Sequence, residues 1–267
     1  MKKKILIIGK KSFIGSNLKN YLSKFFDVNS ISYEDIKNKK KIFFSSFYII
    51  NTSIHKNYIN KKYDKNFDLD RNIVTKLGKK KFLYYFLNSR KIYLPKINIS
   101  ESSKLKPNDN YSKNKLITEK YLKKKLGNQL VSLRVSNVIG KRKFKKNRNN
   151  HHLFLDNFIK YKRQKKKIIV NDDFKDFITI DHFCLIIKSL ISKNINGIFN
   201  ASLGEKVYIS EITKWLNKSY YKKLYFKKQN IDSFTLSNKK LLKRISIKIN
   251  KKQLKNFCKK LKIWLIK

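Results

Sequence analysis

The fold is decided by one stretch near the start of the chain, Lys4-Ile5-Leu6-Ile7-Ile8-Gly9-Lys10-Lys11-Ser12-Phe13-Ile14-Gly15. Its first half is a short apolar run that ends in glycine, which is typical of a strand buried on both faces of a parallel sheet. Its second half opens a helical pattern, because apolar residues then recur on one helix face, at Phe13, Ile14, Leu18, Tyr21 and Leu22. We therefore predict a strand at residues 4–8, a glycine turn and a helix at 13–25.

Strand and helix patterns continue to alternate beyond this unit. The sequence predicts strands near 28–32 and 47–51, a helix near 67–85, a strand at 91–94, a helix at 111–126 and a strand at 130–135. Right-handed crossovers wind such elements into one twisted sheet. The predicted fold class is therefore α/β, a Rossmann-like doubly wound parallel sheet. Ligands of such sheets bind beyond the carboxyl ends of the strands. Four residues lie at predicted carboxyl ends: Gly9, Asn51, Pro95 and Asn137.

The glycine turn has the features of a phosphate site. A turn between a strand and a helix aims backbone N–H groups and the positive end of the helix at an anion, and a diphosphate suits both. The candidate residues are Gly9, Ser12, Phe13, Ile14 and Gly15. An ordinary strand-turn-helix with glycines at its corners remains the alternative, because such motifs are loose.

Tyr111 and Lys115 are the candidate catalytic pair. Residues four apart on a helix lie on one face, so a lysine ammonium here can lie beside a phenol. Such a neighbour favours the phenolate and is expected to lower the pKa of Tyr111 from about 10 toward the range of a general acid/base. Chance is the alternative, since the chain contains 15 tyrosines and many lysines.

Together these two sites resemble the extended short-chain dehydrogenase/reductase family, the NAD(P)-dependent epimerases, dehydratases and reductases of nucleotide sugars. Five further segments resemble the family's motifs in the right order. They are Tyr48-Ile49-Ile50-Asn51-Thr52-Ser53, Glu119 after Lys115, Leu133-Arg134-Val135-Ser136-Asn137-Val138-Ile139-Gly140, Lys175-Asp176-Phe177-Ile178-Thr179-Ile180-Asp181, and Gly197-Ile198-Phe199-Asn200-Ala201. The resemblance covers about residues 3–215.

The resemblance implies a role for each candidate. Tyr111 would exchange a proton with the sugar while hydride passes to or from a nicotinamide, and Lys115 would hold the nicotinamide ribose. Asn51 would lie against the cofactor. Asn137 would contact the substrate diphosphate or cap a turn, and Arg134 would meet a phosphate or form a structural ion pair.

The resemblance also implies the domain organisation. Residues 1–140 would form an NAD(P)-binding domain with the catalytic helix. Residues 141–267 would form a smaller, mixed substrate lobe with elements that return to the sheet. In this part the sequence shows a basic loop at 141–150, a helix near 153–163 and a strand at 167–170. The segment 218–267 suggests only a closing helix or strand.

Two departures from the family pattern bear on activity. Ser12 replaces the middle glycine of the phosphate turn, where a Cβ should either shift the cofactor or weaken its binding, although the serine hydroxyl can donate to a phosphate oxygen. The expected strand end at Leu94-Pro95-Lys96 lacks the family's Ser-Ser or Ser-Thr pair, which binds the substrate oxygen. Asn98 or Ser100 would have to replace that hydroxyl. A missing oriented donor costs roughly 10²–10³ in rate.

These features leave several functions open. The family's 4,6-dehydration needs an acidic pair beside the hydroxyl, and Pro95-Lys96 has none, which argues against a dehydratase. An epimerase that uses NAD and a ketosugar reductase that uses NADPH remain, because Ser30-Ile31-Ser32-Tyr33 supplies neither the acidic nor the basic residue that selects between the cofactors. A cofactor-binding relative with impaired catalysis is the first alternative.

A basic nucleic-acid-binding protein is the second alternative. The chain carries 66 Lys+Arg against 17 Asp+Glu, a formal net charge of +49, which usually suggests nucleic acid. The lysines are spread along the whole chain, however, and the scarcity of Gly and Pro beside abundant Lys suggests an AT-rich gene. We therefore expect an anionic nucleotide-sugar substrate and no nucleic-acid partner.

The remaining expectations concern metals, membranes and location. Cys184 lies in an apolar run and is predicted to be a core residue, and the histidines, including the pair His151-His152, are too scattered for a metal site. No segment approaches the roughly 20 apolar residues that span a bilayer. We expect a cytoplasmic enzyme without a metal, compatible with a homodimer and with a role in polysaccharide biosynthesis.

Overall fold

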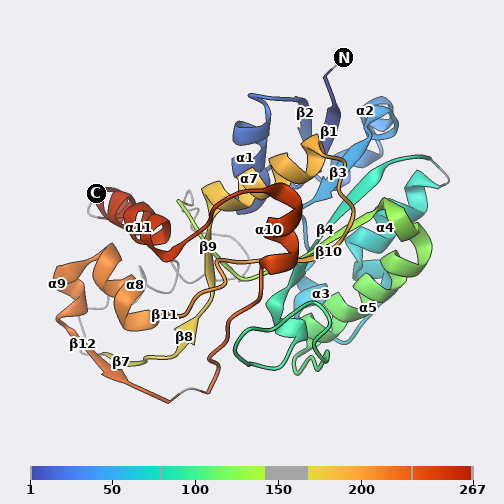
Figure 1. The fold of residues 1–267 in the computed structure, drawn as a ribbon. Coiled ribbons are helices and arrows are strands. Elements are labelled where there is room, and N and C mark those ends of the chain that lie inside the picture. Colours follow the sequence, from blue (N-terminus) through green and yellow to red (C-terminus); the bar gives the residue numbers. More distant parts are fainter. Residues whose placement is uncertain (1, 79, 142–167, 230, 266–267) are drawn as a thin grey trace. The chain divides into compact units, whose positions relative to one another are not determined.

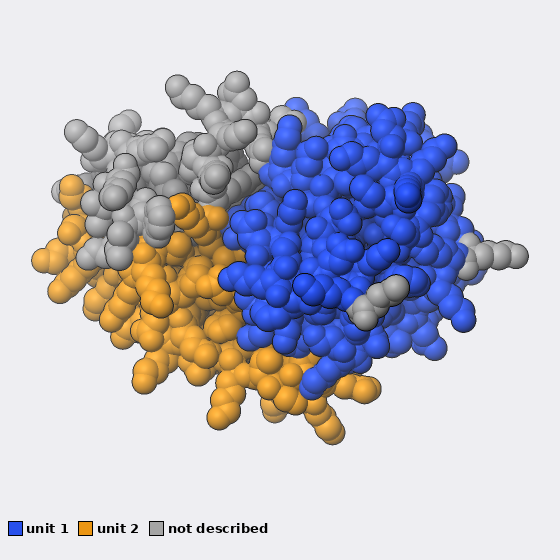
Figure 2. All heavy atoms as spheres, turned by 90° about the horizontal axis from the view of Figure 1, so that it is seen from above, with its two compact units in different colours: residues 1–94, 104–135, 184–199 blue, residues 95–103, 136–183, 200–267 orange. Residues whose placement is uncertain are grey.

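The computed structural model describes residues 2–78, 80–141, 168–229 and 231–265 (Figure 1). The chain forms two compact units, which Figure 2 distinguishes by colour. The first unit comprises Met1–Leu94, Lys104–Val135 and Cys184–Phe199. The second unit comprises Pro95–Ser103, Ser136–Phe183 and Asn200–Lys267.

A six-stranded sheet with the order β10-β5-β4-β3-β1-β2 is the centre of the fold. Its strands are β1 (Lys4–Ile8), β2 (Asp27–Ile31), β3 (Tyr48–Asn51), β4 (Leu83–Ser89), β5 (Leu130–Val135) and β10 (Gly197–Ala201). The pairs from β2 to β5 are all parallel. The chain winds to one side of β1 through β2 and to the other through β3, so the strand order reverses there. This confirms the predicted doubly wound α/β class and places a topological switch point at the ends of β1 and β3.

Helices cover the sheet. In Figure 1, α1 (Phe13–Leu22) lies beside α7 (Ile180–Ser192). A contact supports this arrangement, because Lys188 Nζ on α7 lies 5.1 Å from the ring centre of Phe25, which follows α1. Helices α4 (Leu69–Leu77) and α5 (Asn110–Leu126) pack against each other, and the short helices α2 (Lys40–Ser45) and α3 (Lys56–Asn60) lie in the connections. Leu122 of α5 shares a fully buried apolar cluster with strand residues, among them Leu6, Ile49, Tyr84 and Phe86. Cys184, on α7, is buried as predicted.

The predicted strand at 91–94 is wrong, and so is the extension of the preceding helix to residue 85. Helix α4 ends at Leu77 and is followed by the C-cap Gly78, whose φ of +63° favours glycine, and residues 83–89 form β4. Arg90–Ile92 form a single 3-10 turn. The error has a physical cause: β4 is apolar and aromatic, and a strand buried on both faces shows no alternation that separates it from a helix. The other strands and helices predicted before residue 136 occur within a few residues of their expected positions.

Among its described residues, the second unit contains three two-stranded pairs. They are β6 (Asn137–Ile139) with β9 (Phe177–Thr179), β8 (Phe174–Lys175) with β11 (Val207–Tyr208), and β7 (Ile168–Asn171) with β12 (Leu224–Lys227). The buried Asp176 carboxylate accepts the backbone N–H groups of Leu203, Gly204 and Leu236, which joins distant segments of this unit. The expected strand at 167–170 is β7, whereas the expected helix near 153–163 lies outside the described residues.

The last part of the chain is mainly helical. It contains α8 (Ile209–Leu216), α9 (Lys218–Tyr221), α10 (Lys239–Ile245) and α11 (Lys251–Leu265), and α11 packs against α8. Of the closing helix or strand suggested for residues 218–267, the structure shows the helix, α11, whereas the other elements of this segment were not predicted.

Candidate active site

The glycine turn connects β1 to α1 and is joined to β2. The N–H groups of Gly9 and Lys10 donate to the carbonyl oxygen of Ile31, at 2.7 and 3.1 Å. Gly9 has a φ of +108°, a conformation that favours glycine. A Cβ at Gly15 would lie 2.5 Å from the carbonyl oxygen of Gly9, so no side chain fits there. Both predicted glycines are therefore required by the close approach of helix and strand.

Ser12 has a different role from the one expected. Its hydroxyl accepts the N–H of Gly15 at 2.9 Å as the N-cap of α1 and donates to Thr52 Oγ1 at 2.7 Å. The proton that was expected to reach a phosphate is therefore directed to Thr52. The amides of Phe13 and Ile14, at the positive start of the same helix, are the donors that an incoming phosphate can use.

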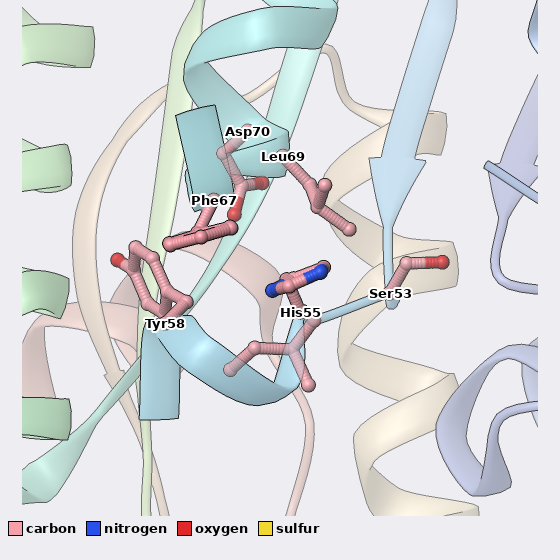
Figure 3. Close-up of a pocket in the computed structure, with 7 residues that line it drawn as sticks. Ser53, His55, Tyr58, Phe67, Leu69 and Asp70 are labelled. Atoms are coloured by element: carbon pink, nitrogen blue, oxygen red, sulfur yellow. The ribbon is translucent and has the colours of Figure 1, made fainter. Parts of the chain in front are cut away.

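The end of β3 borders a small hollow, which Figure 3 shows. Its lining is Ser53, Ile54, His55, Tyr58, Phe67, Leu69 and Asp70, and the rings of His55 and Phe67 stack with centroids 4.6 Å apart. The hollow is shallow: its empty space of about 140 Å³ includes open solvent, and it has almost no enclosed volume. It is therefore not a preformed pocket for a whole small molecule, for which roughly 300 Å³ or more is usual.

Asn51 is the last residue of β3, and its side chain is already engaged. Its amide nitrogen donates to Asp70 Oδ1 at 2.9 Å, and its oxygen accepts the N–H of Ser53 at 2.9 Å. Asn51 thus shapes the turn after β3.

Helix α5 carries Tyr111 and Lys115 on one face. Asp109 and Ser112 form a capping box at its start, and the side chain of Asn114 donates to the carbonyl oxygens of Tyr58 and Lys61. The Lys115 ammonium is buried and donates to the carbonyl oxygen of Leu87 on β4 at 2.8 Å. The helix is therefore held in position by contacts with α3 and with the sheet.

Ser89 is the residue that the sequence analysis missed. It ends β4, and its side chain hydrogen-bonds the phenol of Tyr111. The expectation that this strand lacks a terminal hydroxyl is wrong, because the strand was placed too late in the chain. The signal was present as Asn88-Ser89 after an aromatic run. With Ser89 in place, neither Asn98 nor Ser100 is needed to replace a missing group.

The pKa of Tyr111 also differs from expectation. Burial of the phenol raises its pKa to about 12, the hydrogen bond from Ser89 opposes this, and the Asp109 and Asp70 carboxylates add to it. Burial also lowers the pKa of Lys115, although Asp70 and Asp68 counteract this. The expected depression of the tyrosine pKa is therefore wrong for the free protein, in which desolvation dominates.

Glu119 and Arg134 form a buried ion pair behind the site. Arg134 contacts Glu119 Oε1 at 2.5 Å, and Glu119 Oε2 accepts from Asn88 at 2.7 Å and Ser132 at 2.6 Å. Burial opposes ionisation of Glu119, but the hydrogen bonds from Arg134, Ser132 and Asn88 hold its pKa below the ordinary value. Of the two roles considered for Arg134, the structural ion pair is the one observed. The pair fixes Asn88, the neighbour of Ser89.

The two candidate substrate residues belong to the second unit. Asn98 is exposed, has a φ of +56° and donates its N–H to Thr235 Oγ1. Asn137 begins β6, and its side chain donates to the carbonyl oxygen of Asp176 at 3.1 Å. The other candidates, from Gly9 to Lys115, all lie in the first unit.

The described parts of the chain contain no group of three or more His, Cys, Asp or Glu side chains placed to hold a metal ion. His151 and His152 lie outside those parts. No helix within the described ranges is both long and apolar enough to cross a membrane.

A family model described as the NAD dependent epimerase/dehydratase family matches residues 47–201. The chain belongs to this family. The resemblance read from the sequence motifs is thus confirmed, and the match contains Tyr111, Lys115 and Ser89. No match was found among curated proteins.

Several solved structures share the fold of this chain. A UDP-N-acetylglucosamine 4-epimerase from Methanobrevibacter ruminantium M1, in complex with UDP-N-acetylmuramic acid, has a TM-score of 0.78 at 18% identity over 100% of this chain and 99% of that one. A dTDP-glucose 4,6-dehydratase from Bacillus anthracis, in complex with NAD, has a TM-score of 0.77 at 15% identity, over 98% of this chain and 96% of that one. RMD from Pseudomonas aeruginosa, complexed with NADPH, has a TM-score of 0.74 at 14% identity, over 99% of this chain and 98% of that one. At these identities the likeness is one of fold.

Proposed function

We infer that the protein is an NAD(P)-dependent enzyme of nucleotide-sugar metabolism, an epimerase or a ketosugar reductase. One observation carries this inference: the Ser89 side chain bonds the Tyr111 phenol at the end of β4, with Lys115 one helical turn further along α5. A hydroxyl and a phenol so joined can hold a sugar oxygen between two donors.

The residues of the glycine turn fit a dinucleotide. The amides of Phe13 and Ile14 would hold its diphosphate, and Gly9 and Gly15 leave room for close approach. The bound nicotinamide supplies hydride transfer. Tyr111 would give a proton to the sugar oxygen or take one from it, Ser89 would orient that oxygen, and Lys115 would hold the cofactor ribose.

The substrate class rests on the family and on charge. The Methanobrevibacter structure contains a UDP-sugar derivative, and the +49 net charge of this chain favours an anionic ligand. We propose residues 1–140 as the cofactor-binding part and residues 141–267, with Asn137, as the part that binds the sugar nucleotide.

Dehydration remains disfavoured after the correction of β4. The two residues that follow Ser89 are Arg90 and Lys91, and both are basic. Lys91 forms an ion pair with Asp109 at 3.0 Å. This strand end therefore supplies no acidic pair for an elimination. Its terminal hydroxyl also weakens the case for a catalytically impaired relative.

A thermal melt with NAD+ and with NADPH tests cofactor binding. A cofactor at 100 times its Kd should add about 2.7 kcal/mol of stability, and the cofactor with the larger effect at equal concentration is the preferred one. A panel of UDP- and dTDP-sugars then separates the reactions, because a reductase oxidises NADPH whereas an epimerase converts the sugar without net loss of cofactor. Absence of a melting shift with both cofactors would overturn the proposal.

Ser89→Ala should lower turnover by about 10²–10³-fold, because it removes one oriented donor at the reacting oxygen. Ser89→Thr is the matched control, since it keeps a hydroxyl, and it should retain most of the activity. Steady-state kinetics of both variants with the active sugar provide the measurement. Equal losses in the two variants would indicate that packing, and not the hydroxyl, is responsible.

A further inference from the structure

Asp70 is a buried carboxylate directly behind the candidate site. It lies in the first turn of α4, and its Oδ1 accepts from Asn51 Nδ2 at 2.9 Å and from the Tyr84 hydroxyl at 2.8 Å. Figure 3 shows Asp70 among the residues that line the hollow after β3. A carboxylate is expensive to bury, so its presence here calls for a buried positive partner.

Lys115 is that partner. Its ammonium lies 3.9 Å from Asp70 Oδ2, and both side chains are only 7% exposed. The same ammonium donates to the carbonyl oxygen of Leu87 and lies 4.6 Å from the ring centre of Phe86. Four elements thus meet at one charge pair, with Asp70 from α4, Lys115 from α5, Asn51 from β3 and Tyr84 from β4.

We propose that Asp70 is a positioning residue, which fixes the Lys115 ammonium and offsets its charge, and so sets the acid/base behaviour of Tyr111. This inference rests on the proposed roles of Tyr111 and Lys115. The Asp70 charge acts on both residues, because it favours the ammonium of Lys115 and disfavours the phenolate of Tyr111. The titratable side chains around Asp70 are Asp68 at the N-cap of α4, Tyr84 on β4, Tyr58 on α3, His55 before α3, and Lys115 and Tyr111 on α5.

The influence of the Asp70 charge on Lys115 and Tyr111 depends on pH. Burial raises its pKa to about 6, although Lys115 opposes the rise. The charge of Asp70 is therefore present above pH 6 and is lost as the pH falls through this value. Below it, Lys115 loses its counter-charge, and the influence of Asp70 on Tyr111 disappears.

Competitive acetylation of the free protein tests this inference. Trace acetic anhydride is applied across a pH series, and peptide mass spectrometry gives the midpoint at which Lys115 becomes reactive, with the exposed Lys113 of the same helix as the internal reference. Asp70→Asn should lower the midpoint of Lys115 by about one pH unit or more, since an opposite charge at this distance favours the ammonium. The midpoint of Lys113 should stay constant.

Tyr84→Phe is the matched control, because it removes one donor to Asp70 but keeps the carboxylate charge. Its Lys115 midpoint should remain close to that of the unchanged protein. An unchanged midpoint in Asp70→Asn, or an equal shift in Tyr84→Phe, would overturn the inference. If Asp70→Asn does not fold, Asp70→Asn combined with Lys115→Met should restore folding, because no charge is then left unpaired. Failure of the double variant to recover stability would also overturn it.

The consequence for catalysis is measured separately. In Asp70→Asn, the limb of the pH–rate profile that reports Tyr111 should move to lower pH by about one unit. The acetylation experiment needs neither cofactor nor substrate. A shifted Lys115 midpoint in a protein that binds no cofactor would thus reject the proposed function alone.

Discussion

Replacing Tyr111 by phenylalanine should lower turnover of the nucleotide sugar by about 10²–10⁴-fold, the usual contribution of a positioned general acid or base. The ring stays in place at the start of α5, and only the hydroxyl that bonds Ser89 is removed. Binding of NAD+ or NADPH, followed by the thermal melt, should be retained, since the amides of the glycine turn are untouched.

Tyr121→Phe is the control for this experiment. Tyr121 lies on the same helix, but its hydroxyl faces Thr75 Oγ1 at 3.3 Å on the α4 side. Loss of that hydroxyl should leave turnover nearly unchanged. If Tyr111→Phe retained the activity of the unchanged protein with the same sugar, Tyr111 would not be the proton donor, and the assignment of the site would fail.

Glu119→Gln should destabilise the protein by about 3–5 kcal/mol, because it leaves the buried Arg134 guanidinium without a counter-charge. The new amide would also direct two N–H donors at Asn88 and Ser132, which now donate to the carboxylate. Urea unfolding at constant salt gives the change in midpoint and slope. Glu34→Gln is the control, since Glu34 is exposed, and its midpoint should be almost unchanged.

The effect of Glu119→Gln should also depend on pH. Because the folded-state pKa of Glu119 is depressed, the stability that its charge contributes is complete above the unfolded value of about 4.3. It is lost as the pH falls through the lower folded-state value. The difference between the two proteins should therefore shrink toward zero in acid. A difference that is the same at pH 7 and in acid would show that packing, and not the ion pair, is responsible.

These residues show which parts of the site can be predicted locally. Tyr111 and Lys115 are one helical turn apart, and the strand-turn-helix around Gly9 is continuous in the chain, so spacing and periodicity are sufficient to find them. The same holds for the fold class, because alternating strands and helices admit few topologies. The family resemblance followed from motifs in the right order.

The ends of buried strands could not be predicted in this way. A parallel strand covered on both faces has no period of its own, so the aromatic run of β4 was included in the preceding helix and Ser89 was overlooked. Gly78 was the local sign of the helix end. The placement of this one strand changed the site from one without a hydroxyl to one with Ser89 beside Tyr111.

The sequence by itself determined the doubly wound α/β class, the glycine turn and the tyrosine–lysine pair, since each depends on neighbours along one element. Only the tertiary structure decided that Ser89 meets Tyr111, that Ser12 caps α1, and that Asp70 stands behind Lys115. These contacts join residues from different elements, and the pKa of a buried group depends on everything packed around it. Desolvation in the assembled first unit therefore raises the pKa of Tyr111, whereas the lysine spacing alone predicts that it should fall.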